Sequence, residues 1–256
     1  MGRGPVVEKK KGLVNAQKGK VFAIHAKLIS LAAQSGGDPN MNPHLYEAIE
    51  KAKRANVPNE NIDRAIKKGT GEDKTGVQLQ EANYEGYGPG GVAIIVSTIT
   101  DNKNRTASDI RHIFSRFGGN MGEPGSVSFI FSKMGVIYID LTINNKDEIE
   151  ELVLETNATD MFEEGNYLKI ISEMTDLKAT KEFLESKNIV LESAKIDYIY
   201  STASEVTDFD QALKITKMLD SFEESDDVEA VHCNAIIDEE LQTKVYDFIE
   251  KNTFKY

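Results

Sequence analysis

Basic side chains are the residues of this chain whose type and placement suggest a chemical task, and that task is the neutralisation of phosphate. Residues 1–70 contain 13 Lys or Arg against 6 Asp or Glu, a net charge of +7. Lys and Arg that neutralise backbone phosphates release bound counterions and so supply affinity for nucleic acid. The candidate contacts are the basic residues of this segment from position 9 onward and two in a later polar turn: Lys9, Lys10, Lys11, Lys18, Lys20, Lys27, Lys51, Lys53, Arg54, Arg64, Lys67, Lys68, Lys103 and Arg105.

The acidic balance of the whole chain restricts this basic surface to one end. The chain has 30 Lys or Arg and 42 Asp or Glu, so residues 71–256 retain 17 and 36 of them, a net charge of −19. That part would repel phosphate, and it could face away from nucleic acid or dock a basic protein. Two simpler roles stay open: the lysines could merely solvate a helical bundle, and Lys67 and Lys68 could stabilise the negative end of a helix dipole.

No catalytic, metal or cofactor constellation is recognisable in the sequence. The four histidines have no i, i+4 pair and no Cys partner at ligand spacing, and Cys233 is the single cysteine. The glycine-rich residues 86–91 precede a predicted strand, whereas phosphate-binding glycine loops follow a strand and open a helix. We therefore expect no enzyme activity, no cofactor and no metal, although an active site assembled only by folding stays an open alternative.

Three short helices are predicted to position the N-terminal basic residues. Apolar residues recur at helical spacing over residues 15–34, with Lys20 and Lys27 on the opposite face. A second helix is predicted for residues 43–55 and a third for residues 58–68, where a first-turn proline is tolerated. Because the apolar stripes are narrow, the three helices need one another for burial.

The rest of the chain is predicted to alternate between strands and helices. The expected strands are 92–99, 126–131, 136–141, 167–171, 194–200 and 228–233, and the expected helices are 107–117, 146–156, 177–186, 209–222 and 238–251. Residues 136–200 come close to a complete βαββαβ set, and the later helix and strand resemble the missing half of the unit that begins at residue 92. We therefore predict short parallel or mixed sheets with helices on one face.

This order predicts an α+β fold: an N-terminal three-helix domain followed by two small α/β domains of the ferredoxin-like βαβ kind, one inserted in the other. The expected domains are a basic helical domain (1–75), a discontinuous α/β domain (76–132 plus 205–237), an inserted α/β domain (133–204) and a C-terminal helical tail (238–256). No apolar run approaches the roughly 20 residues that a membrane-spanning helix needs. With no secretory signal and a lone cysteine, a cytoplasmic protein is expected.

Dense motifs between residues 36 and 127 resemble those of a known family. They are Gly-Gly-Asp-Pro at 36–39, Ala-Ile-Glu-Lys-Ala-Lys-Arg-Ala-Asn at 48–56, Arg-Ala-Ile-Lys-Lys-Gly-Thr-Gly at 64–71, Tyr-Glu-Gly-Tyr-Gly-Pro-Gly-Gly at 84–91, Asp-Asn-Lys-Asn-Arg-Thr at 101–106 and Gly-Glu-Pro-Gly-Ser-Val at 122–127. In combination they are similar to the YebC/PmpR family, which is described as probable transcriptional regulators and whose mitochondrial relatives are described as translational activators. The resemblance implies a helical N-terminal domain plus two α/β domains.

Three functions follow as expectations. The first is a non-enzymatic regulator of gene expression that binds DNA through the basic faces of residues 9–68, with Lys103 and Arg105 as further contacts. The second is a translation factor that binds ribosomal RNA, since a small basic bundle can also sit on irregular RNA through shape and backbone contacts. The third is an adaptor that docks other proteins. The sequence does not separate DNA from RNA.

Overall fold

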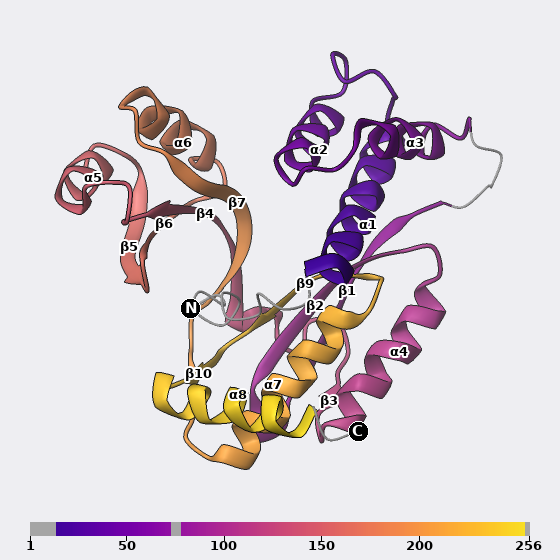
Figure 1. The fold of residues 1–256 in the computed structure, drawn as a ribbon, viewed down its shortest axis with the longest axis vertical. Helices are drawn as coiled ribbons and strands as arrows, with labels where there is room; N and C mark the ends of the chain where they lie inside the picture. Colours follow the sequence, from indigo (N-terminus) through magenta and orange to yellow (C-terminus); the bar gives the residue numbers. More distant parts are fainter. Residues whose placement is uncertain (1–13, 73–77, 254–256) are drawn as a thin grey trace. The chain divides into compact units, whose positions relative to one another are not determined.

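The computed structural model describes residues 14–72 and 78–253, and for residues 14–18 it describes the backbone alone. Within these ranges, contacts divide the chain into two compact units (Figure 1). Residues 128–203 form one unit, here called the inserted unit. The residues on either side of it, 14–127 and 204–253, form the other, here called the main unit. The chain therefore leaves the main unit, builds the inserted unit and returns.

Three helices form the N-terminal bundle of the main unit: α1 (Val14–Ala33), α2 (Pro43–Arg54) and α3 (Asn59–Gly69). Asn42 caps α2, because its side-chain oxygen accepts a hydrogen bond from the Leu45 backbone N–H at 3.1 Å. The apolar stripes of the three helices meet in one core, whose buried members are Ile29, Ala33, Leu45, Ile49, Ala52, Val57, Ile62 and Ala65. All three helices lie where the sequence predicts them, within two residues at each end.

The first and third helices approach each other closely. A Cβ atom added at Gly69 would lie 2.2 Å from the Ser30 carbonyl oxygen, so this approach requires glycine. The Ser30 hydroxyl donates a hydrogen bond to the Ala65 carbonyl at 2.8 Å, which satisfies a polar group inside the bundle.

A four-stranded antiparallel sheet forms the body of the main unit. Its strands in spatial order are β3 (Asn120–Met121), β1 (Gln80–Tyr87), β2 (Ala93–Thr100) and β9 (Val228–Cys233). The turn η1 (Pro89–Gly91) joins β1 to β2, and Gly90 and Gly91 have φ angles of 74° and 79°. Only glycine adopts this region readily, so the glycine-rich stretch shapes the entry into β2.

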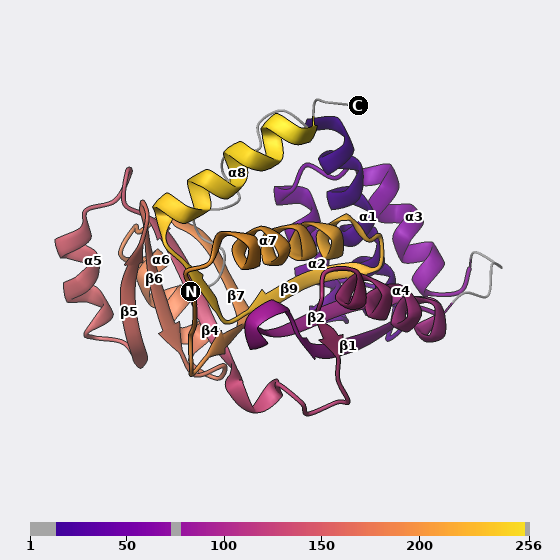
Figure 2. The ribbon, with the colours of Figure 1, turned by 90° about the horizontal axis from the view of Figure 1, so that it is seen from below.

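Helices α4 (Lys103–Arg116), α7 (Phe209–Glu224) and α8 (Glu239–Thr253) complete the core of the main unit (Figure 2). Phe114 of α4 and Phe222 of α7 are fully buried and pack edge to face at 4.9 Å between ring centroids. Leu241 and Val245 of α8 belong to the same cluster, so this helix packs into the core of the main unit. Strands β8 (Ser204–Val206) and β10 (Ala235–Ile237) form a short parallel pair.

The inserted unit has the order βαββαβ. Its elements are β4 (Phe131–Asp140), α5 (Lys146–Val153), β5 (Ala158–Glu164), β6 (Tyr167–Ser172), α6 (Leu177–Ser186) and β7 (Leu191–Tyr200). The strands pair antiparallel in the order β5-β6-β4-β7, which is the ferredoxin-like arrangement. Alternate residues such as Ile137, Ile139, Leu168 and Ile170 cluster with buried residues of both helices.

The predicted α+β class and the insertion of one α/β domain into another are confirmed, but several details of the prediction are wrong. Both four-stranded sheets are antiparallel rather than parallel or mixed. Strands β1 and β5 were not predicted, because each is largely polar or half-exposed and lacks a continuous apolar pattern. Residues 128–130 form a short 3-10 turn, η2 (Ser128–Ile130), and not a strand. The four-part domain division stays a prediction.

Candidate nucleic-acid interface

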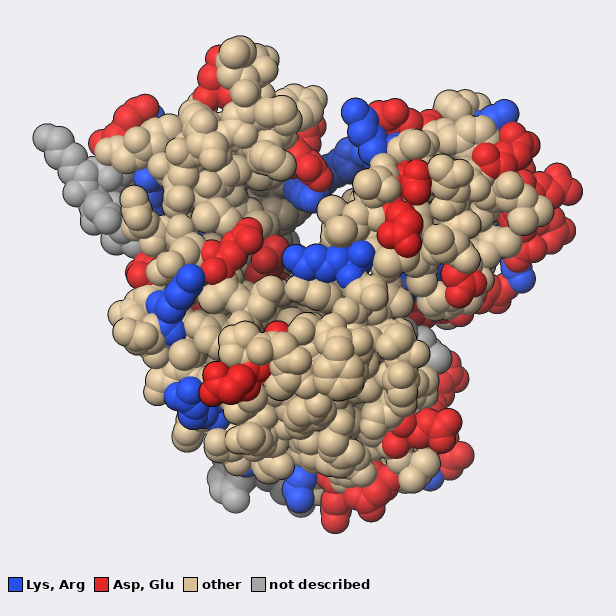
Figure 3. All heavy atoms as spheres, turned by 180° about the vertical axis from the view of Figure 1, so that it is seen from behind, with Lys and Arg blue, Asp and Glu red and all other residues tan. Residues whose placement is uncertain are grey.

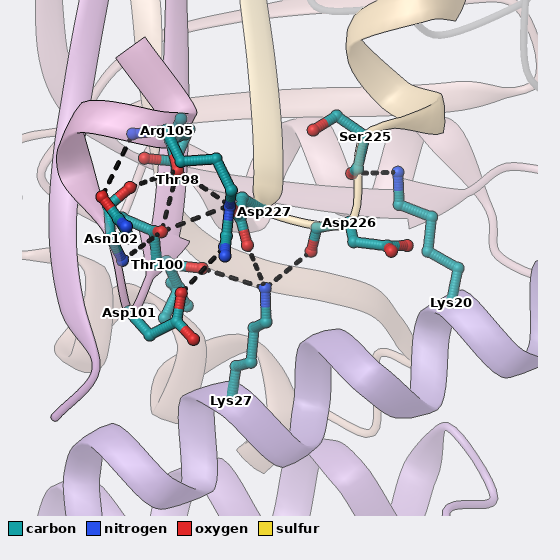
Figure 4. Close-up of polar contacts among 12 residues, drawn as sticks. Lys20, Lys27, Thr98, Thr100, Asp101, Asn102, Arg105, Ser225, Asp226 and Asp227 are labelled. Carbon is teal, nitrogen blue, oxygen red and sulfur yellow. Dashed lines mark hydrogen bonds and ion pairs between the residues drawn. The ribbon is translucent and has the colours of Figure 1, made fainter. Parts of the chain in front are cut away.

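Two of the predicted basic residues converge on one carboxylate within the main unit (Figure 4). Lys27 of α1 places its Nζ 2.8 Å from Asp227 Oδ1, and Arg105 of α4 places Nη2 3.0 Å from Asp227 Oδ2. Arg105 Nη2 also lies 2.8 Å from Asp101 Oδ1. The side chain of Asp227 is only 12% exposed and that of Lys27 is partly buried, so their contact is partly desolvated, whereas Arg105 is half exposed and its pair with Asp101 lies at the surface. The segment just before β9 is thereby joined to α1 and α4.

The turn between β2 and α4 positions the other donors to this carboxylate. Asn102 caps α4 by accepting a hydrogen bond from the Arg105 backbone N–H at 3.1 Å. The Thr106 hydroxyl, one residue further, donates to Asp227 Oδ2 at 2.8 Å, and the Thr100 hydroxyl lies 3.2 Å from the same oxygen. The polar turn that the sequence indicated is therefore a cap and a hydrogen-bonding platform.

These donors stabilise the ionised form of Asp227. Burial by itself would raise the pKa of this carboxyl. Hydrogen bonds from Lys27, Thr106 and Arg105 outweigh burial and lower the pKa to about 2. Asp227 is therefore a fixed negative charge at any pH at which the protein would function.

The inward face of α1 carries Lys20 and Lys27, and this corrects their expected outward orientation. Lys27 Nζ also donates to the carbonyl oxygens of Ile99 and Asp226, at 3.1 and 2.8 Å. Lys20 Nζ donates to the Ser225 carbonyl at 2.9 Å, and burial lowers the pKa of Lys20. The seven-residue spacing correctly predicted that both lysines lie on one face of the helix. That face lies against the α/β body, because carbonyl and carboxylate groups of the body accept hydrogen bonds from the two ammonium groups.

Three other predicted cations form ion pairs within their own helix. Lys51 pairs with Glu47, Lys53 with Glu50 and Arg64 with Glu60, each at 2.9 Å and each between exposed side chains. Such pairs contribute only about 0.3–0.5 kcal/mol each, so a polyanion can compete for these cations.

Four predicted cations are exposed and make no ion pair with any residue in the described ranges: Arg54, Lys67, Lys68 and Lys103. Lys67 and Lys68 lie in the last turn of α3, and Arg54 ends α2. The predicted contacts Lys9, Lys10 and Lys11 lie outside the described residues, as does the side chain of Lys18. Among the described side chains, the bundle thus contributes three exposed cations without an ion pair, from the ends of two neighbouring helices.

Basic and acidic side chains are unevenly distributed over the molecule. Residues 128–203 contain 7 Lys and 15 Asp or Glu. Figure 3 shows one face of the molecule on which the Lys and Arg side chains are scattered among Asp and Glu and form no continuous patch. This face therefore offers no uniform positive field to a polyanion.

The inserted unit has an ionic cluster of its own. Lys169 is 1% exposed, its Nζ lies 3.7 Å from Glu164 Oε2, and it approaches the rings of Tyr138 and Phe162 at 5.5 and 5.3 Å from their centroids. The Tyr138 hydroxyl donates to Glu164 Oε2 at 3.3 Å. Burial lowers the pKa of Lys169 and raises the pKa of Tyr138. Ring faces and one carboxylate replace the water that this ammonium group loses.

Within residues 14–72 and 78–253, no group of three or more His, Cys, Asp or Glu could hold a metal ion. No helix in residues 14–72 and 78–253 is both long enough and apolar enough to cross a membrane.

Sequence reasoning missed Asp227, the carboxylate on which Lys27, Arg105 and Thr106 converge. It stands in the acidic run Glu-Glu-Ser-Asp-Asp at 223–227, immediately before a predicted strand. That run could have been identified as a candidate partner of basic residues. Its actual partners are 200 and 122 residues away in the chain, and only the fold brings them together.

Two family models match the chain, and between them they span most of it. Residues 5–72 match the TACO1/YebC protein N-terminal domain, and residues 79–235 match the TACO1/YebC second and third domain.

The chain is similar to proteins named as probable transcriptional regulators and to a solved structure. A probable transcriptional regulatory protein of Rhodococcus jostii is 42% identical over 239 residues, which cover 93% of this chain and 95% of that protein. One of Persephonella marina is 44% identical over 241 residues, with coverages of 93% and 96%. The crystal structure of a conserved hypothetical protein from Aquifex aeolicus superposes with a TM-score of 0.82 at 40% identity, and covers 91% of this chain and 96% of that one. The predicted family is thereby confirmed, and the chain belongs to the TACO1/YebC family.

Proposed function

We propose that this protein is a non-enzymatic regulator of gene expression that binds nucleic acid through the exposed cations of its N-terminal bundle, with DNA as its target. The observation that carries the proposal is a set of exposed cations on the bundle that form no ion pair with any residue the structure describes, Arg54, Lys67 and Lys68. The names of the relatives, probable transcriptional regulatory protein, support DNA as the target and transcription as the process.

The physical basis of binding is the neutralisation of backbone phosphates. Lys67 and Lys68 stand side by side in the last turn of α3, and the ion-paired Lys51, Lys53 and Arg64 can join them when a phosphate outcompetes an exposed carboxylate. Contacts to phosphate give affinity without sequence information. We therefore expect binding that weakens steeply with salt and shows a modest preference among sequences.

Charge reversal tests the proposal. Lys67→Glu combined with Lys68→Glu changes the bundle, and Lys178→Glu combined with Lys181→Glu makes the same change of charge on a helix of the inserted unit. Fluorescence anisotropy with a labelled DNA duplex and an RNA hairpin of equal length measures affinity over a salt series. The bundle variant is expected to bind DNA about tenfold more weakly, with a salt slope lower by about 1.8.

The matched variant separates a local contact from a change in net charge. If both double variants lose affinity equally, net charge is responsible and the bundle is not the interface. If neither loses affinity, phosphate contact by α3 is excluded. Tighter binding of the RNA hairpin than of the duplex would reassign the target to RNA while leaving the interface in place.

A further inference from the structure

Asp227 forms ion pairs with two cations that were predicted from the sequence to contact nucleic acid. Lys27 and Arg105 reach its two carboxylate oxygens at 2.8 and 3.0 Å, from different helices. One partly buried carboxylate thus engages a cation of the basic bundle, Lys27, and a cation of α4, Arg105, which also pairs with Asp101. A carboxylate and a backbone phosphate compete for the same Lys and Arg donors.

The same contact fixes the bundle to the α/β body of the main unit. Lys20 donates to the Ser225 carbonyl, and Lys27 donates to the Asp226 carbonyl and to the Asp227 carboxylate. The two ammonium groups of α1 therefore hydrogen-bond to three consecutive residues, 225–227. Figure 4 shows these lysines extending from one side of α1 toward that segment. Loss of the Asp227 charge would leave Lys27 with carbonyl partners only.

We propose that Asp227 makes an autoinhibitory contact: it occupies Lys27 and Arg105 and holds α1 against the α/β body, and the phosphates of a bound nucleic acid displace it. This rests on the proposed function, because it requires a polyanion to bind the bundle. In the closed form the exposed cations of α2 and α3 make the first contact. In the open form Lys20 and Lys27 become available to further phosphates, Arg105 keeps only the exposed Asp101 as a carboxylate partner, and α1 is released.

A comparison of two neighbouring aspartates tests the proposal in the full-length chain. Asp227→Asn removes the charge that engages Lys27 and Arg105. Asp226→Asn removes the same formal charge one residue away, where an exposed side chain makes no hydrogen bond within the described ranges. Anisotropy with the labelled DNA duplex is expected to show Asp227→Asn binding about fivefold or more tightly than Asp226→Asn. Its salt slope should be steeper by about 1 to 2.

Each outcome of the affinity measurement bears on one of the two proposals. Equal affinities of the two variants, with the wild type binding measurably, would overturn the autoinhibitory contact and leave the proposed function standing. Absence of binding by all three proteins to duplex and hairpin in dilute buffer would overturn the proposed function and the contact with it.

Hydrogen exchange of the wild-type protein tests the displacement without any variant. Saturating DNA duplex is expected to speed the exchange of backbone amides in residues 20–27 of α1 and in residues 225–228, because their mutual contact opens. Unchanged or slower exchange at both segments in the presence of bound duplex would refute displacement, whether or not the Asp227→Asn protein folds.

Discussion

The acid dependence of stability gives a quantitative test of the contacts around Asp227. The pKa of this carboxyl is about 2 in the folded protein, against 3.8 as its ordinary value. A difference of that size corresponds to about 2 kcal/mol of stabilisation, since each pKa unit is worth about 1.4 kcal/mol. Asp227→Asn is therefore expected to lower the free energy of opening of the main unit by about 2 kcal/mol near neutral pH.

The sign of the pH dependence follows from the direction of the shift. A carboxyl whose pKa is lowered on folding stabilises the folded state at every pH above its unfolded pKa, and the stabilisation disappears as pH falls through the folded pKa. The difference between wild type and Asp227→Asn should thus be constant from neutral pH down to about pH 5, shrink below about pH 4 and vanish near pH 2.

Native-state hydrogen exchange of slowly exchanging amides in β2 and α4 is the appropriate assay, with correction for the intrinsic exchange rate at each pH. It reports opening of the main unit alone, whereas a single unfolding curve would mix the two units. Asp226→Asn serves as the control and should show little difference from wild type. A destabilisation by Asp227→Asn that is equally large near pH 2, or absent at neutral pH, would refute the assigned contacts.

Three further substitutions test the packing of each unit by native-state hydrogen exchange of slowly exchanging amides in the unit that carries the substitution. Gly69→Ala should destabilise the bundle and alter the near-ultraviolet spectrum, because the new methyl group meets the backbone of α1, whereas Gly19→Ala meets nothing and should be neutral or stabilising. Phe114→Ala should cost roughly 3–5 kcal/mol through the cavity it leaves, and a loss below about 1 kcal/mol would contradict its burial. Lys169→Met should cost roughly 3–5 kcal/mol of stability, because it leaves the buried carboxylate of Glu164 without its cation. Adding Glu164→Gln should recover much of that loss. No recovery would show that Lys169 and Glu164 do not act as a pair.

Much of the fold was predictable because its signals are local. The helix α6 and the strand β9 have the predicted bounds, and the cap residue Asn42 and the glycines of η1 perform the roles that their types favour. The strands β1 and β5 were not predicted because they are partly exposed and polar. What makes them strands is pairing with neighbouring strands, and the sequence pattern of β1 or β5 alone does not show that pairing.

The sequence by itself determined the α+β class, the inserted βαββαβ order apart from β5, and the concentration of positive charge in the first 70 residues, because periodicity, caps and charge counts are properties of neighbouring residues. Only the tertiary structure decided which of those charges are available. Lys27 and Arg105 meet Asp227 across 200 and 122 residues, while Lys67 and Lys68 meet no acidic partner within the described ranges. A Coulomb interaction depends on distance in space, and that distance is set by how the whole chain packs.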